Sequence, residues 1–360
     1  MKSVDEAVLN GADWTDVNTW RKEQRARIRA ERLALPPAQR RELGARILGH
    51  AEAGFPELAG AVVGFYWPFR GEVDVLPLLK RHGAGGGRAV LPVVVQRNAP
   101  VEWWQWTPDT KMAPGIWNIP VPAERRPLEP VALLVPLLGF DAAGYRLGNG
   151  GGYYDRTLAT LQPRPLTLGI GYELGRLETI HPQSHDIPLD AVVTETGVHW
   201  PPATREGVEL SSPVCYADEA ASSLPEYFGY LSRAETLAVL DALLDEAACA
   251  WRRALGIADE VQRALPESVA LLRELARGLA TLRHLLAHVG GAAHAAAQVP
   301  AQAVTEPAAA LKPMLQRTTQ RLQEALPRIR DEALHAGLQD LLVLHERAGA
   351  HCDALLARLG

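Results

Sequence analysis

The chain has 360 residues, more than one hydrophobic core usually organises, so the sequence predicts two domains. Its composition, 47% hydrophobic and 22% charged with a mean hydropathy near zero, is that of a soluble globular protein. The net charge of -5 gives no reason to expect nucleic acid or an anionic membrane as the main partner.

The three cysteines indicate a reducing compartment. Cys215, Cys249 and Cys352 are far apart, odd in number and without metal-ligand spacing, as free thiols are. The N-terminus has no apolar run long enough for a signal peptide. No apolar stretch reaches the length of about eighteen residues that a membrane helix needs. The sequence therefore predicts a cytoplasmic protein.

The first half of the chain alternates short apolar runs with helical patterns. Helices are expected over residues 17–35, 38–53, 73–82 and 152–161, the first two separated by Pro36 and Pro37. Strands are expected over residues 61–69, 88–95, 101–106, 131–140, 165–172 and 191–196. Several strands are continuously apolar, as strands buried on both faces tend to be. Residues 1–200 are therefore predicted to form an α/β domain with an open, mostly parallel sheet flanked by helices.

The second half changes character after residue 200. Residues 201–222, with several Pro and Ser and no sustained apolar period, have linker composition. Beyond them every apolar pattern is helical, with a low-complexity Ala/Gln/Pro stretch at 291–303. Four helices are expected: from the capping box of Ser232 and Glu235 to about residue 255, then over 267–289, 308–326 and 328–359, with a break near Gly349 left open. Residues 223–360 are therefore predicted to form an all-α four-helix bundle.

Residues 146–156, Arg-Leu-Gly-Asn-Gly-Gly-Gly-Tyr-Tyr-Asp-Arg, have the composition of a phosphate-binding loop. Backbone amides can approach a phosphate chain unobstructed at the glycines Gly148, Gly150, Gly151 and Gly152. A helix that starts near Gly152 would direct its N-terminal amides at the same anion. Arg146 and Arg156 add charge, and Asp155 is a candidate Mg²⁺ ligand. The alternative is a glycine-rich turn that serves packing alone.

Two common nucleotide motifs do not fit this loop. The Gly-Lys-Ser/Thr ending of a Walker A loop is missing, and no acidic residue stands where a Rossmann fingerprint requires one.

Three other features carry chemistry. Glu72 follows the first predicted strand and either recognises a donor-rich ring or favours a helix dipole. An unusual density of indoles is either a stacking surface or core: Trp103, Trp104, Trp106 and Trp117. The first helix carries a basic face, either solvated or phosphate-binding, made of Arg21, Lys22, Arg25, Arg29 and Arg32.

In this combination and order the features resemble the 5-formyltetrahydrofolate cyclo-ligase family, also called methenyltetrahydrofolate synthetases. The likeness covers about residues 18–200. The matching pieces are Lys22, Arg25 and Arg32; Tyr66-x-Pro68 before Glu72-Val-Asp74; Leu91-Pro92; Val135-Pro136 with Gly139-Phe140-Asp141-x-x-Gly144; the glycine signature; and His185-Asp186 before Val192-Val-Thr-Glu195.

The resemblance implies a ligase that uses ATP and Mg²⁺ to cyclise 5-formyltetrahydrofolate to 5,10-methenyltetrahydrofolate by phosphorylating the formyl oxygen. It implies catalytic roles for Tyr153, Arg146 and Asp155, with Asp155 as the metal ligand. ATP is expected to bind Lys22, Arg25, Arg146, Gly148, Asn149, Gly150, Gly151, Gly152, Tyr153, Tyr154 and Asp155. The folate is expected to bind Tyr66, Glu72, Trp103, Trp104 and Trp117.

Two departures from the family pattern lie on the folate side. Val121 stands where the family often has a glutamate, and the glutamine usually found after the penultimate strand is missing from residues 172–177. They leave open a catalytically impaired protein that binds folate or nucleotide and acts through its bundle. A ligase for a different N-formyl or amide substrate is a further alternative.

The bundle resembles a degenerate ferritin-like helical module. Its last helix offers Glu332-Ala-Leu-His335, but Glu274-Leu-Ala-Arg277 stands where a di-iron site needs a second Glu-x-x-His. An arginine cannot ligate a metal, so the metal set is incomplete. The bundle is therefore expected to mediate homodimerisation or to bind a protein partner.

Overall fold

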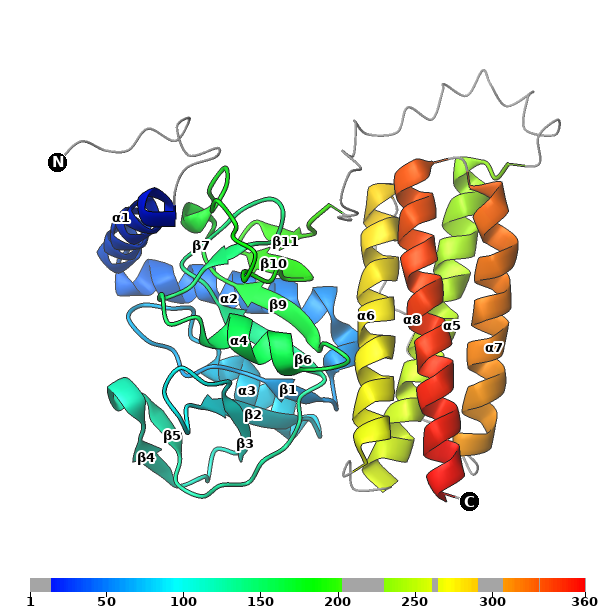
Figure 1. The fold of residues 1–360 in the computed structure, drawn as a ribbon, viewed down its shortest axis with the longest axis horizontal. Helices are drawn as coiled ribbons and strands as arrows, with labels where there is room; N and C mark the ends of the chain where they lie inside the picture. The colour runs from blue at the N-terminus through cyan, green and yellow to red at the C-terminus, as the bar shows by residue number, and fades with distance from the viewer. Residues whose placement is uncertain (1–13, 203–229, 261–264, 291–306, 330, 360) are drawn as a thin grey trace. The chain divides into compact units, whose positions relative to one another are not determined.

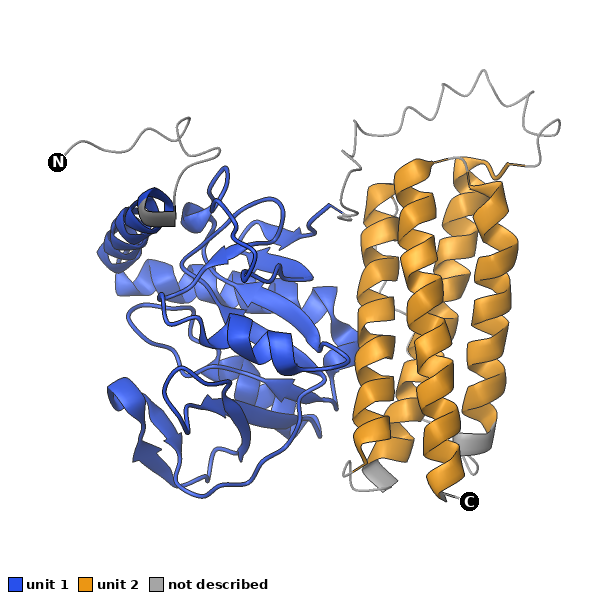
Figure 2. Ribbon diagram, in the orientation of Figure 1, with its two compact units in different colours: residues 1–202 blue, residues 203–360 orange. Residues whose placement is uncertain are grey.

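The computed structural model describes residues 14–202, 230–260, 265–290, 307–329 and 331–359 (Figure 1). The chain divides into two compact units, residues 1–202 and 203–360 (Figure 2). Most of the predicted linker (203–222) and the low-complexity stretch (291–303) lie outside the described residues, as does Cys215. Within the described ranges, none of the helices has the length and apolar character needed to cross a membrane.

A seven-stranded sheet forms the centre of the first unit. Its spatial order is β11 (Gly197–His199), β10 (Ala191–Thr194), β9 (Leu166–Ile170), β6 (Ala132–Pro136), β1 (Val62–Gly64), β2 (Arg88–Val93) and β3 (Glu102–Trp106). The inner strands pair in parallel, and the edge strands β11 and β3 are antiparallel to their neighbours. Every residue of β9 and β10 is buried, including Thr167 and Thr194, as is usual for strands covered on both faces. The predicted sheet is confirmed.

Helices flank this sheet on both faces (Figure 1). They are α1 (Trp14–Ala34), α2 (Pro37–Gly54), α3 (Leu76–Ala84) and α4 (Tyr153–Thr160), with short 3₁₀ turns η2 (Pro56–Leu58), η3 (Ile116–Asn118) and η4 (Glu173–Gly175). The two prolines separate α1 from α2 for different reasons. The residue before a proline avoids helical geometry, so α1 ends ahead of Pro36. Pro37 is the first residue of α2. The N–H groups of a first helical turn have no acceptor within the helix, so a proline there costs no hydrogen bond.

Several short strands were not predicted. The predicted strand 131–140 is divided into β6 and β7 (Gly139–Phe140), and β7 pairs with β8 (Arg146–Leu147), the start of the glycine signature. The hairpin of β4 (Met112–Pro114) and β5 (Pro120–Pro122) was also missed, because prolines and a glycine give it the composition of a loop.

Gly175 lies against the backbone of Leu138, which provides a stability test. A Cβ at Gly175 would lie 2.2 Å from the Leu138 carbonyl oxygen, and a backbone atom cannot move aside as a side chain can. We expect Gly175→Ala to lower the free energy of unfolding by about 1–3 kcal/mol in denaturant titrations. Gly49→Ala in α2 is the control, since nothing lies within 4 Å of its added Cβ. Equal stability of the two variants would contradict the prediction.

The described part of the second unit is a four-helix bundle of α5 (Arg233–Glu260), α6 (Pro266–His288), α7 (Pro307–Ala325) and α8 (Glu332–Leu359), with a turn η7 (Leu326–Arg328). The capping box is confirmed: the Glu235 amide donates to Ser232 Oγ at 3.3 Å, and the Ser232 amide donates to Glu235 Oε2 at 2.7 Å. The break left open near Gly349 is absent, because α8 runs through it.

Two side chains of the bundle that could ligate a metal, Glu246 and His335, have other partners. Glu246 binds Arg321 at 3.0 Å and Thr318 at 3.2 Å. His335 Nε2 contacts the Gln339 amide at 3.0 Å. The described residues contain no cluster of three or more His, Cys, Asp or Glu placed to hold a metal ion. The ferritin-like resemblance stays a prediction.

Candidate active site

The glycine signature forms an exposed turn between β8 and α4. Gly150 and Gly152 have φ of 95° and 64°, in the left-handed region that glycine adopts without a Cβ penalty. Asn149, Gly150 and Gly151 are exposed, and Gly152 precedes the first turn of α4. The turn therefore presents its backbone to solvent beside a helix N-terminus.

The basic face of α1 packs against this turn. Arg25 Nε donates to the Gly148 carbonyl at 2.9 Å, and Arg29 Nη2 donates to Asn149 Oδ1 at 3.3 Å. One turn further along, the buried Arg32 donates to the Arg70 carbonyl at 2.7 Å. Lys22 is exposed and makes no hydrogen bond or ion pair with the described residues. The face is thus directed at the loops rather than fully solvated.

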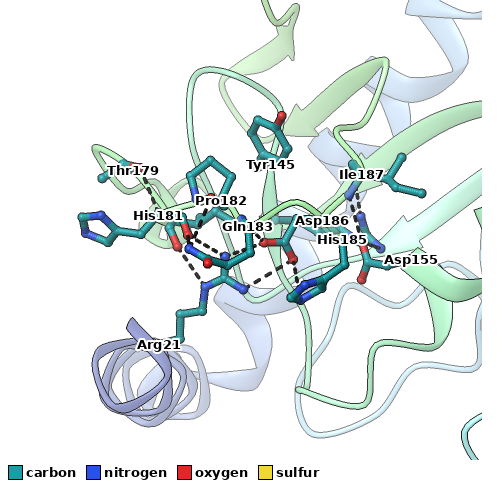
Figure 3. A network of polar contacts seen from close by, with 12 residues as sticks. Arg21, Tyr145, Asp155, Thr179, His181, Pro182, Gln183, His185, Asp186 and Ile187 are labelled. Carbon is teal, nitrogen blue, oxygen red and sulfur yellow. Dashed lines mark hydrogen bonds and ion pairs between the residues drawn. The ribbon is translucent and has the colours of Figure 1, made fainter. Parts of the chain in front are cut away.

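The first arginine of this face, Arg21, anchors the loop of residues 180–187 (Figure 3). Its guanidinium donates to the Ile180 carbonyl at 3.0 Å, to the His181 carbonyl at 2.8 Å and to Asp186 Oδ2 at 2.6 Å. Asp186 also accepts from the Gln183 amide at 2.7 Å. Burial raises the pKa of Asp186, but the hydrogen bonds from Arg21 and Gln183 outweigh burial and leave it lowered. Arg21 was expected on the basic face of the first helix, but its contacts with residues 180–186 were not predicted.

Arg146 and Asp155 bind each other and the same loop. The buried Arg146 donates through Nη1 to the Ile187 carbonyl at 3.0 Å and lies 3.2 Å through Nη2 from Asp155 Oδ1. Asp155 Oδ1 also accepts from the Ile187 amide at 3.2 Å, a bond drawn in Figure 3. The expected metal ligand thus has one oxygen engaged, while its Oδ2 makes no hydrogen bond within the described residues.

Tyr153 and Trp117 are brought together, although they were assigned to different ligands. The Trp117 ring meets the Tyr153 ring edge-on at 5.6 Å between centroids. The Arg156 guanidinium lies 4.8 Å from the Tyr153 centroid and donates to the Gly151 carbonyl at 2.5 Å. Trp117 has φ of 56° and remains 59% exposed. An exposed aromatic surface therefore borders the glycine turn.

Glu72 contacts the amide nitrogen of the Asn149 side chain, whose amide oxygen contacts Arg29. Its Oε2 accepts from the Phe69 amide at 3.0 Å, and its Oε1 accepts from Asn149 Nδ2 at 3.1 Å. Burial raises the pKa of Glu72, and the nearby Arg32 offsets part of that increase. Glu72 also lines a groove of about 530 Å³ beside α2 and α3. Tyr66, also assigned to the folate, is buried and donates its hydroxyl to the Val73 carbonyl at 2.9 Å.

Trp103 and Trp104 are not brought together, which corrects their expected common surface. Successive strand residues point to opposite faces, so Trp103 enters the core of the unit while Trp104 Nε1 donates to Glu102 Oε2 at 2.8 Å on the other face. Trp103 packs against Tyr154, with 6.3 Å between the centroids of the two rings. The Trp103 Nε1 and the Tyr154 hydroxyl are both buried without a hydrogen-bond partner in the described ranges.

Comparison with known proteins matches the first unit. The model of the 5-formyltetrahydrofolate cyclo-ligase family matches residues 17–195. The 5-formyltetrahydrofolate cyclo-ligase of Escherichia coli is 32% identical over 178 residues, 48% of this chain and 98% of that enzyme. That of Haemophilus influenzae is 29% identical over 181 residues, 48% of this chain and 97% of that enzyme.

Among solved structures, that of Aquifex aeolicus 5,10-methenyltetrahydrofolate synthetase is 28% identical in sequence to this chain. The match covers 53% of this chain and 97% of the Aquifex aeolicus chain, with a TM-score of 0.46. The family model and the near-complete coverage of the Escherichia coli enzyme give the same assignment. The chain belongs to the 5-formyltetrahydrofolate cyclo-ligase family.

Proposed function

We propose that the chain catalyses the ATP- and Mg²⁺-dependent cyclisation of 5-formyltetrahydrofolate to 5,10-methenyltetrahydrofolate. In this reaction the formyl oxygen attacks the γ-phosphorus of ATP, and ADP leaves. N10 then attacks the formyl carbon and gives up its proton, and the C–O bond breaks so that inorganic phosphate leaves with that proton. The products are the methenyl folate, ADP and phosphate.

The observation that carries this proposal is the convergence of α1 cations on an exposed glycine turn. Arg25 and Arg29 already contact Gly148 and Asn149 of that turn, and Lys22 is on the same helix. Phosphoryl transfer depends mainly on positioning and on neutralising charge, which backbone amides and cations supply. In the proposal, the turn holds the phosphate chain of ATP and the α1 side chains neutralise it.

The donor set fits Mg²⁺ held jointly with a nucleotide. Mg²⁺ is usually bound by one or two carboxylates together with phosphate oxygens and water. Asp155 offers its Oδ2 for such a role, while Arg146 and Ile187 fix the carboxylate through Oδ1. We assign Arg146 to orienting Asp155, and the bound ion would supply charge neutralisation at the transferred phosphoryl group.

On the folate side the proposal relies on Glu72 and Trp117. The Glu72 carboxylate would accept hydrogen bonds from the donor-rich pterin ring, and the exposed Trp117 indole offers a face for a flat ring. Tyr153, in contact with Trp117, would lie where the two ligands meet. Val121, the departure noted in the sequence, is in β5 opposite Ala113 of the same hairpin.

A turnover assay tests the proposal directly. Purified full-length protein, 5-formyltetrahydrofolate, ATP and Mg²⁺ are expected to give the near-ultraviolet absorbance of the methenyl product, and omission of either ATP or Mg²⁺ should abolish it. The Escherichia coli enzyme serves as a positive control. Absence of product beside an active control would overturn the proposal. Tight binding of folate and ATP without product would instead support the catalytically impaired binding protein.

A further inference from the structure

One side chain of the glycine turn connects the two sides of the site. Asn149 Oδ1 accepts from Arg29 Nη2 at 3.3 Å, and Asn149 Nδ2 donates to Glu72 Oε1 at 3.1 Å. Arg29 belongs to the cationic face of α1, and Glu72 follows the first strand of the sheet. The Asn149 amide therefore bridges a cation of the nucleotide side and the carboxylate of the folate side.

The chemistry of this bridge suits an amide. A guanidinium can only donate and a carboxylate can only accept, so the residue between them must accept on one side and donate on the other. The Asn149 amide does both without adding charge, and its two partners fix its orientation. An aspartate there would bind Arg29 but repel Glu72, and a leucine of similar size would bind neither.

We propose that Asn149 couples the two ligand sites, so that a phosphate chain at the glycine turn strengthens folate binding at Glu72. A phosphate is a stronger acceptor for Arg29 than a neutral amide, so a bound phosphate chain competes with Asn149 Oδ1. Without Arg29 the Asn149 side chain is held by Glu72 alone, and we expect its hydrogen bond to Glu72 Oε1 to weaken. A partly buried carboxylate oxygen without a donor gains most from the hydrogen-bond donors of a ligand.

This coupling rests on the proposed function, because it assigns ATP to the turn and the pterin to Glu72. The experiment is calorimetric titration of the full chain with 5-formyltetrahydrofolate, with and without a saturating non-hydrolysable ATP analogue and Mg²⁺. We expect the analogue to tighten folate binding about 2- to 10-fold, the effect of about one hydrogen bond. Linkage requires the folate to tighten analogue binding by the same factor.

Two variants separate coupling from a merely structural role. Asn149→Leu should reduce the ratio of folate dissociation constants with and without analogue to about one. Folate binding is expected to weaken at low pH, when Glu72 becomes protonated. In Asn149→Asp this weakening should begin at a higher pH, because a second carboxylate beside Glu72 raises the higher of the two apparent pKa values of the pair. Asn18→Asp is the control: it adds the same charge at an exposed position of α1 and should change neither readout.

The outcomes distinguish the coupling from the function beneath it. A ratio of one in the wild type, or an unchanged ratio in Asn149→Leu, would overturn the coupling while folate and nucleotide binding still support the proposed function. If the wild type binds neither ligand, the proposed function fails and the coupling fails with it.

Discussion

Replacing Arg21 with methionine is expected to lower the free energy of unfolding by about 3–5 kcal/mol, because it leaves Asp186 as a buried charge without its partner. The side chains of Arg21 and Asp186 are only 4% and 11% exposed, and Nη2 lies 2.6 Å from Oδ2. The same guanidinium also satisfies two backbone carbonyls, of Ile180 and His181. Methionine keeps most of the side-chain volume but removes all of these hydrogen bonds.

Denaturant titration followed by circular dichroism measures this loss. Arg27→Met is the matched control on the same helix, since Arg27 pairs with Glu31 at 2.9 Å where both side chains are about half exposed. An exposed i,i+4 pair contributes about 0.3–0.5 kcal/mol, so the control should change stability only slightly. Similar losses in the two variants would contradict the buried anchor.

Acid should reduce the difference between wild type and Arg21→Met. Because the pKa of Asp186 is lowered in the folded protein from its ordinary 3.8, its contribution is present above that value. The contribution is lost as the pH falls through the folded-state pKa. The wild type should therefore lose the part of its advantage that Asp186 provides below about pH 4, while the part from the two backbone carbonyls remains. A difference that stays constant to lower pH would argue against the Arg21–Asp186 pair as its source.

The elements of the fold were predictable where burial on both faces leaves a long apolar run. Strand β6 is part of such a run, and the prolines between α1 and α2 mark a boundary by their own chemistry. The strands β4, β5 and β8 are two or three residues long and carry little pattern of their own. They are specified by pairing partners, which local periodicity does not reveal.

The site was predictable to the extent that it is local in sequence. The glycine turn and its helix lie within one short segment, so its shape follows from residue types alone. The Arg25–Gly148 and Arg21–Asp186 contacts join residues more than one hundred positions apart, and no spacing predicts them. The separation of Trp103 from Trp104 was available in the sequence, because neighbours in a strand face opposite ways.

Glu72 gives the largest expected effect on catalysis. Glu72→Gln keeps the shape of the side chain but removes the charge that is proposed to accept the pterin donors. A hydrogen bond to a charged group contributes about 1.5–3 kcal/mol, so kcat/KM for 5-formyltetrahydrofolate should fall about 10- to 150-fold. Binding of the ATP analogue alone should persist, because Arg25 and Lys22 remain. The control is Glu124→Gln, at an exposed ion pair with Arg126. It should change neither kcat/KM for 5-formyltetrahydrofolate nor the dissociation constant of the ATP analogue.

The pH profile separates the charge of Glu72 from its shape. Burial raises the pKa of Glu72 above its ordinary 4.5, so protonation should remove the accepting carboxylate at a pH above that value. In the wild type, kcat/KM for the folate should therefore fall as the pH decreases through the raised pKa, since this ratio reports groups of the free enzyme. Glu72→Gln has no such group to protonate and should lose this acid limb. An acid limb that persists unchanged in Glu72→Gln would assign the titration, and with it the accepting role, to another residue.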